Sequence, residues 1–145
     1  MRTLWTDKFA SLRQQTKHRA DIKPQVGMGV TQHVGSDSNP WEIIEVIDDK
    51  HIVVRELEYV RTDKNGMSDC QDYQYYSNDT NRTKRLTFRG DRWCSYVQEE
   101  RAKMDENGEP IRDENGTVYE LIVTRKLSRD FWKVGVAIRY YDFSF

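Results

Sequence analysis

Arginine and lysine side chains alternate with aromatic ones in two parts of the chain, and this mixture suits a phosphate-bearing ligand. A guanidinium binds phosphate oxygens through two parallel hydrogen bonds, and an aromatic face stacks on a base. The pattern therefore indicates a site for a nucleotide or a single nucleic acid strand. A second interpretation stays open, because exposed strand faces also carry such residues as cross-strand pairs. The two sets are Arg82, Lys84, Arg85, Arg89 and Arg92 around Trp93, and Arg125, Lys126, Arg129, Lys133 and Arg139 among Phe131, Trp132, Tyr140 and Tyr141.

The stretch 61–76 adds carboxylates and amides close to these cations. It contains an Asn-Gly turn followed by a run in which tyrosines alternate with other residues. Its polar groups could hydrogen-bond sugar hydroxyls or base edges, or they could satisfy the backbone of the turn itself. The second interpretation applies more to Asp63 and Asn65 than to the residues after the turn. The residues that strand alternation places on one face are Gln71, Tyr73 and Tyr75.

The sequence contains no pattern that specifies catalysis or metal binding. The three histidines, His18, His33 and His51, have no ligand spacing and fall on different expected elements. The two cysteines, Cys70 and Cys94, match no metal or redox spacing. The nucleophile elbow, the phosphate loop and the dinucleotide fingerprint are all missing. We therefore predict a protein that is not an enzyme and that uses no metal and no cofactor.

The composition predicts a single folded domain. The 145 residues are 12% aromatic and 32% charged, with a formal net charge of -1. Segments 1–25, 81–95 and 121–145 are net positive, whereas 26–80 and 96–120 are net negative. Duplex DNA usually binds a basic domain, so this distribution argues against it. No segment has the continuous apolar run of a secretion signal or a membrane span, which predicts a cytoplasmic protein.

Hydrophobic periodicity predicts a mainly β fold with one N-terminal helix. Leu4, Trp5, Phe9 and Leu12 recur at helical spacing, so a helix is expected over residues 3–20. From residue 26 onward, alternation predicts about eight short strands separated by turns. Such strands favour a small, bent antiparallel barrel of SH3-like character. The strands are expected at 26–34, 41–47, 51–57, 71–76, 82–92, 93–97, 118–126 and 133–141, with a loop at 35–40.

An acidic segment at residues 99–118 contains two Asn-Gly turns and is expected to protrude as a small hairpin. The aromatic C-terminal residues are expected to dock on the body of the protein. The expected organisation is one domain, 1–145, divided into 1–25, 26–98, 99–118 and 119–145.

Four groups of residues carry a resemblance to a known group of proteins. They are Val26-Gly27-Met28-Gly29-Val30-Thr31; Ser36-Asp37 with Pro40, Glu45 and Val46; Arg61-Thr62-Asp63 with Asn65-Gly66-Met67-Ser68 and Gln71; and Tyr141-Asp142-Phe143-Ser144-Phe145. In these motifs the chain resembles a group of small uncharacterised proteins encoded by tailed bacteriophages and prophages, which has no assigned activity. The resemblance covers roughly residues 26–95 and the last few residues. His33 and Val34 depart from the pattern, which has an aromatic residue before Ser-Asp.

The resemblance implies a phage origin and therefore action in the host cytoplasm. Small phage accessory proteins commonly counter host defence, and one simple way is to sequester a nucleotide immune signal. The leading hypothesis is a non-catalytic, homo-oligomeric anti-defence protein that captures a phosphate-bearing nucleotide. Two alternatives stay open: an SH3-like module that binds a host protein or single-stranded nucleic acid, and a virion or assembly component. The residues expected to bind the ligand are Arg61, Asp69, Gln71, Tyr73, Tyr75, Arg89, Trp93, Arg125, Arg139, Tyr141 and Asp142.

Overall fold

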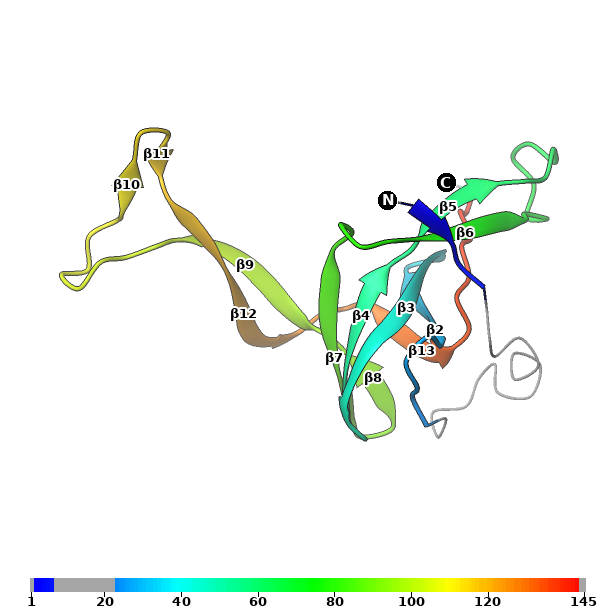
Figure 1. Ribbon diagram of the computed structural model, residues 1–145, viewed down its shortest axis with the longest axis horizontal. Helices are drawn as coiled ribbons and strands as arrows, with labels where there is room; N and C mark the ends of the chain where they lie inside the picture. Colours follow the sequence, from blue (N-terminus) through cyan, green and yellow to red (C-terminus); the bar gives the residue numbers. More distant parts are fainter. Residues whose placement is uncertain (1, 7–22, 144–145) are drawn as a thin grey trace. The chain divides into compact units, whose positions relative to one another are not determined.

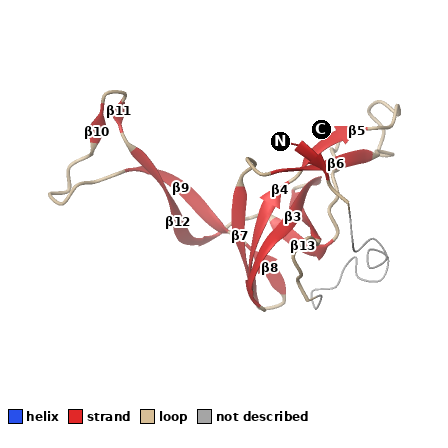
Figure 2. Cartoon of the chain, in the orientation of Figure 1, coloured by secondary structure: helices blue, strands red, loops and turns tan. Residues whose placement is uncertain are grey.

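The chain forms two compact units, and both are built from β-strands. The computed structural model describes residues 2–6 and 23–143. One unit, the barrel unit, comprises Met1–Ser95 and Arg129–Phe145, and the other, the ribbon unit, comprises Tyr96–Ser128. The regular elements of the described residues are all strands (Figure 2). The predicted β class is therefore confirmed.

Six strands of the barrel unit close into an antiparallel barrel (Figure 1). The pair Trp132 and Trp93 joins the last strand to the strand before the ribbon and completes the ring. Closure leaves none of these six strands at an open sheet edge. The order around the barrel is β13 (Phe131–Gly135), β2 (Gly29–Val34), β3 (Asp37–Asp48), β4 (His51–Glu56), β7 (Thr83–Arg89) and β8 (Arg92–Cys94).

The core of the barrel consists of the inward-facing side chains of these strands. In β4, for example, Ile52 and Val54 are fully buried whereas Val53 is only partly buried, as strand alternation requires. Trp41 and Trp132 pack edge to face, with ring centroids 5.2 Å apart. The other buried members of this cluster are Met28, Val30, Ile43, Leu86, Trp93 and Val134.

A buried polar network links five segments of the barrel unit next to this core. The indole Nε1 of Trp41 donates to Oε1 of Gln32 at 3.1 Å, and Nε2 of Gln32 donates to Oδ2 of Asp130 at 2.7 Å. The hydroxyl of Ser95 donates to the other oxygen of Asp130 at 3.1 Å, and the ammonium of Lys84 lies 3.9 Å from Oδ2. The carboxylate of Asp130, whose side chain is only 7% exposed, is thus held by several donors, as a buried charge must be.

A separate three-stranded sheet corrects the prediction for the N-terminus. Its strand order is β1 (Arg2–Leu4), β6 (Tyr73–Asn78) and β5 (Glu58–Arg61). The helix expected over 3–20 is wrong at its start, because Thr3 and Leu4 pair with Ser77 and Tyr76 of β6. Long-range backbone pairing here overrides a local helical pattern. The rest of the expected helix, from residue 7 on, lies outside the described residues.

Several other expected boundaries differ from the structure. The strand expected over 82–92 is divided by a turn at 90–91 into β7 and β8, and β5 was not expected. The loop expected at 35–40 is only a tight turn at residues 35 and 36, where Gly35 has a φ of 59°, and β3 already begins at Asp37. Residues 37–40 are in the strand because each of them pairs with β2. The final strand, expected at 133–141, ends at Gly135. By contrast, the expected hairpin with a turn after Asp48 is confirmed as β3–β4.

After β13 the C-terminal segment, residues 136–143, runs across β2 and docks on the barrel unit, as expected. The Thr31 hydroxyl donates to Val136 O at 2.6 Å and accepts from Ile138 N at 3.0 Å. Gly29 permits this approach, because a Cβ there would lie 2.5 Å from Ala137 N. Further along, Ser38 and Tyr140 exchange two backbone hydrogen bonds of 2.8 and 2.9 Å.

The ribbon unit is an antiparallel pair, β9 (Tyr96–Ala102) with β12 (Tyr119–Leu127). Between them lie the short strands β10 (Arg112–Asp113) and β11 (Gly116–Thr117). The two expected turns are present, with positive φ at Gly108 and Gly116. The ribbon unit, 96–128, contains the expected 99–118 segment and also β12, because β12 pairs with β9 and not with a barrel strand.

Replacing Thr31 by valine tests how firmly the C-terminal segment is held. Valine matches threonine in shape but leaves Val136 O and Ile138 N without their hydroxyl partner. The free energy of unfolding should fall by about 1–3 kcal/mol, the cost of unsatisfied buried polar groups, as measured by urea denaturation. Thr31→Ser keeps the hydroxyl, so its free energy of unfolding should fall by less than that of Thr31→Val. Equal losses in both variants would contradict this role.

Candidate functional site

Eight of the eleven residues expected to bind a ligand come together in the barrel unit. They lie on the β5–β6 pair, on the loop that joins these strands and on the C-terminal segment. Hydrogen bonds and ring contacts link most of them directly. These residues are Arg61, Asp69, Gln71, Tyr73, Tyr75, Arg139, Tyr141 and Asp142.

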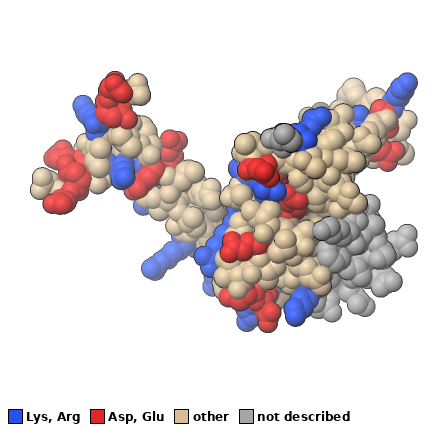
Figure 3. Space-filling view, in the orientation of Figure 1, with Lys and Arg blue, Asp and Glu red and all other residues tan. Residues whose placement is uncertain are grey.

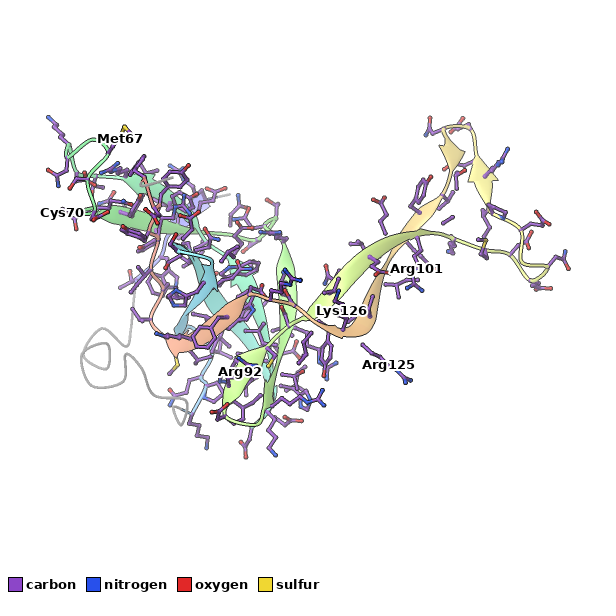
Figure 4. The ribbon with its side chains drawn as sticks, turned by 180° about the vertical axis from the view of Figure 1, so that it is seen from behind. Met67, Cys70, Arg92, Arg101, Arg125 and Lys126 are labelled. Carbon is purple, nitrogen blue, oxygen red and sulfur yellow. The ribbon has the colours of Figure 1, made fainter. Side chains whose placement is uncertain are left out.

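The other three expected residues lie elsewhere. Trp93 is 4% exposed and packs edge to face on Phe88, with centroids 5.3 Å apart, so it belongs to the core and presents no ring face to a ligand. Arg89 is exposed at the end of β7, directly opposite Arg92. Arg125 is exposed on β12 of the ribbon unit (Figure 4).

Arg61 and Asp63 organise the loop between β5 and β6. The Nε and Nη2 atoms of Arg61 donate to the two oxygens of Asp63 at 2.7 and 2.8 Å. The same carboxylate accepts from the backbone amides of Asn65 and Asp72, each at 2.8 Å. The Arg61 guanidinium and these amides hold the pKa of Asp63 well below its ordinary value, and the pKa of Arg61 is raised in turn by Asp63. Asp63 and Asn65 thus serve the turn itself.

Gln71 joins this loop to the C-terminal segment. Its Nε2 donates to Tyr141 O at 2.7 Å, and its Oε1 accepts from Tyr141 N at 3.1 Å. The Tyr73 hydroxyl also donates to Oε1, at 2.7 Å. The amide therefore completes a strand-like pairing with Tyr141.

Carboxylates secure the C-terminal segment at two further points. The Tyr140 hydroxyl donates to Asp69 Oδ1 at 2.6 Å, and this hydrogen bond raises the pKa of Tyr140 to about 12. Asp37 accepts from the backbone amide of Asp142 at 2.7 Å. Asp69 is thus engaged within the chain.

Arg139 is the cation of this cluster that has no carboxylate partner among the described residues. Its Nη1 donates to Asn39 Oδ1 at 2.7 Å, whereas its buried Nε has no hydrogen-bond partner. The guanidinium lies 4.7 Å from the ring centroid of Tyr59 and 5.6 Å from that of Tyr141. These two rings are 39% and 43% exposed. A delocalised cation between two accessible rings can accept an anion and offer stacking surfaces for a planar group.

The sequence prediction missed Tyr59 and Asn39. Tyr59 stands two residues before Arg61 on β5 and opposite Tyr75 of β6, so it shares the face of Arg61, Tyr73 and Tyr75. Period-two alternation would have placed it there. Asn39 gave no such signal, because it comes from a strand that was expected to be a loop.

An open depression of about 530 Å³ adjoins Tyr59. Arg2 and Glu58, two of its lining residues, form an ion pair at 3.5 Å. Glu56, Leu57 and Asn81 complete the lining. Among residues 2–6 and 23–143 no group of three or more His, Cys, Asp or Glu side chains is arranged to hold a metal ion.

Comparisons with known proteins do not assign a family. A scan against protein-family models finds no match, and searches of curated proteins and of solved structures find no significant match either. In the described part of the chain, no helix has the length and apolar character that crossing a membrane requires.

The depressed pKa of Asp63 predicts a pH-dependent contribution to stability. A carboxylate with a lowered folded-state pKa stabilises the fold above its unfolded value, and this stabilisation is lost as the pH falls toward the folded value. Asp63→Asn should therefore lower the free energy of unfolding at neutral pH, and the difference from the wild type should shrink below about pH 4. Urea denaturation at several pH values measures both. The exposed Asp72→Asn is the matched control, and a difference for Asp63→Asn that does not depend on pH would exclude this role.

The raised pKa of Tyr140 predicts a late step in an alkaline absorbance titration of the tyrosines. The contribution of its hydrogen bond should persist below pH 10 and be lost as the pH rises toward 12. Tyr140→Phe should remove the late step, and Asp69→Asn should move it to lower pH. A late step that survives in both variants would assign it to another tyrosine.

Proposed function

We propose that the chain is a non-catalytic binding protein that captures a phosphate-bearing nucleotide at Arg139. Phage origin, action in the host cytoplasm against a nucleotide immune signal, and an SH3-like class for the barrel are parts of this proposal. The resemblance of the sequence to phage-encoded proteins supports the origin. The short strands, and the two register shifts between β3 and β4, support the SH3-like class. Binding of this kind needs no catalytic group.

The observation that carries the proposal is the setting of Arg139. Arg61 is neutralised by Asp63, which would repel an incoming phosphate. Arg139 has only neutral partners among the described residues, namely Asn39 and Ser38 O, so its charge is not neutralised. Its Nε is buried, so a ligand would meet the terminal nitrogens of the guanidinium. A phosphate oxygen accepting from a guanidinium forms a strong, charge-assisted hydrogen bond. Arg139 is therefore the cation of the cluster that is best placed for an anionic ligand.

The surrounding rings would provide the stacking surface. Tyr59 and Tyr141 each use one face to contact Arg139 and remain partly exposed. A base stacked on such a ring contributes about 1–3 kcal/mol. Gln71, Asp69 and Tyr73 act behind this surface, because they hold the backbone of Tyr141 and the phenol of Tyr140 in place. Five of the expected ligand residues would thus bind or position the ligand from one local geometry: Arg139, Tyr141, Gln71, Asp69 and Tyr73.

A second candidate function, the binding of single-stranded nucleic acid, is favoured by a different surface. Arg85, Arg89 and Arg92 are exposed on β7 and β8, and Arg89 faces Arg92 across the strand pair. Exposed cations on neighbouring strands attract the phosphates of a nucleic acid strand. The face of the molecule in Figure 3 mixes acidic and basic side chains, which does not suit duplex DNA.

Calorimetry with mononucleotides, cyclic dinucleotides and cyclic ADP-ribose isomers tests the proposal. At least one of them should bind, and Arg139→Gln should weaken that binding about ten- to hundredfold, the value of a charged hydrogen bond. Tyr141→Ala removes an exposed ring and should weaken binding with the fold retained. Arg112→Gln, on the ribbon unit, is the matched control.

Thermal denaturation of each variant separates loss of binding from loss of folding. Failure of all these nucleotides to bind the folded wild type would refute the proposal. A single-stranded oligonucleotide that binds with strong salt dependence, and less well to Arg89→Gln, would establish the second candidate in its place.

A further inference from the structure

One face of the ribbon strand β12 exposes a row of apolar side chains. Tyr119, Leu121 and Val123 alternate along the strand and therefore share a face. They are 57%, 73% and 63% exposed, and Leu127 at the end of the strand is 36% exposed. Single exposed apolar residues are ordinary, but a contiguous row marks an interaction surface.

The ribbon is also incomplete as a sheet. Within the described residues β12 pairs with β9 alone, so its other edge has no strand beside it. A two-stranded ribbon is marginally stable in water, whereas three or more strands with an apolar face can be stable. A further strand on the β12 edge would supply what the ribbon lacks.

We propose that β12 pairs with β12 of a second copy of this chain, antiparallel about a two-fold axis at Val123. The four strands β9, β12, β12 and β9 then form one continuous sheet, and each copy presents the same surface to the other. In this register the odd-numbered residues of one copy stand opposite the odd-numbered residues of the other. The apolar rows of the two copies therefore lie on the same side of the sheet.

The charges of β12 match this register. Glu120 stands opposite Lys126 of the second copy, so the two-fold axis produces two equivalent ion pairs between opposite charges. On the apolar face Tyr119 stands opposite Leu127, and Val123 stands opposite its own copy. Leu121 stands opposite Arg125, whose aliphatic stem can cover it while the guanidinium stays in water. Opposite charges and apolar pairs directly across two strands are both stabilising. Glu120 and Lys126 thus provide the charge complementarity that selects a second copy as the partner.

The bulge in β12 also fits this pairing. Residues 124–126 have no partner in the β9 register, which passes from Val123 opposite Gln98 directly to Leu127 opposite Tyr96. In the proposed dimer, residues 120–122 of the second copy stand opposite them. Within the chain the Thr124 hydroxyl donates to Val97 O at 2.9 Å and accepts from Lys126 N at 3.2 Å, and the dimer would add a strand partner on the other edge.

The edge of β9 is unsuited to the same role. Glu99 and Glu100 lie at the middle of this strand. Self-pairing centred on either residue would place that glutamate against its own copy, which is unfavourable. β9 therefore serves as the control edge.

Cysteine cross-linking tests the register directly. In the proposed dimer the two Val123 positions face each other at a spacing that a disulfide can bridge. In a Cys70→Ser background, which removes the exposed native thiol, Val123→Cys should form a covalent dimer on mild oxidation. Glu99→Cys in the same background should stay monomeric. The opposite result, with cross-linking at Glu99 and none at Val123, would overturn the proposal.

Charge reversal tests the chosen partner. Glu120→Lys or Lys126→Glu alone places like charges opposite each other at both symmetry-related positions. The dissociation constant of the dimer should therefore rise roughly tenfold. Mixing the two variants restores both ion pairs in a heterodimer, so association should return to the wild-type level. Sedimentation velocity over a range of concentrations measures each case, and tryptophan fluorescence of the barrel checks folding. A wild type that stays monomeric throughout, or a mixture that fails to associate, would refute self-pairing.

Discussion

The docking of the C-terminal segment on β2 is the contact on which the candidate site depends. Gly29 lets the backbone of residues 136 and 137 approach, and the Thr31 hydroxyl fixes that backbone through one donated and one accepted hydrogen bond. Everything that follows along the chain, including Arg139 and Tyr141, reaches the β5–β6 face from this anchor. The geometry proposed to bind an anion is therefore a consequence of close packing between two segments more than a hundred residues apart, and local strand structure alone would not produce it.

The motifs on which the proposed phage origin rests meet around this segment. Gly29 and Thr31 hold its beginning, Asp37 accepts from the amide of Asp142, and Gln71 pairs with the backbone of Tyr141. Arg61 of the third motif lies 5.6 Å from the ring of Phe143. Four groups of residues that are scattered in the sequence thus form one structural unit, and the ribbon takes no part in it. Their shared purpose within the chain is to place the C-terminal residues.

Alternation along the chain predicted most of the barrel, but it merged β7 and β8 into one strand over 82–92, which a turn at 90–91 divides. It also predicted the shared face of Tyr73 and Tyr75, and the turn residues after Asp48 predicted the hairpin. It could not predict pairing partners: β12 has a strong strand pattern but pairs outside the barrel, and Leu4 joins β6 through contacts distant in sequence. In the sequence Trp93 and Tyr141 are both aromatic residues near arginines, but Trp93 lies in the core and Tyr141 lies on the surface. The approach of Tyr59 to Arg139 likewise depends on the tertiary fold.

The hydrogen bond between Ser95 and Asp130 has an evolutionary consequence. These residues flank the ribbon in sequence, and the buried network with Gln32 and Trp41 holds them together whatever the length of chain between them. The entropic cost of closing a loop rises only slowly with its length. Because Ser95 and Asp130 hold the two ends of the segment together, insertions between them should be tolerated. The barrel can therefore acquire, enlarge or exchange the segment 96–128 as a module, and new surfaces can evolve there without disturbing the candidate site.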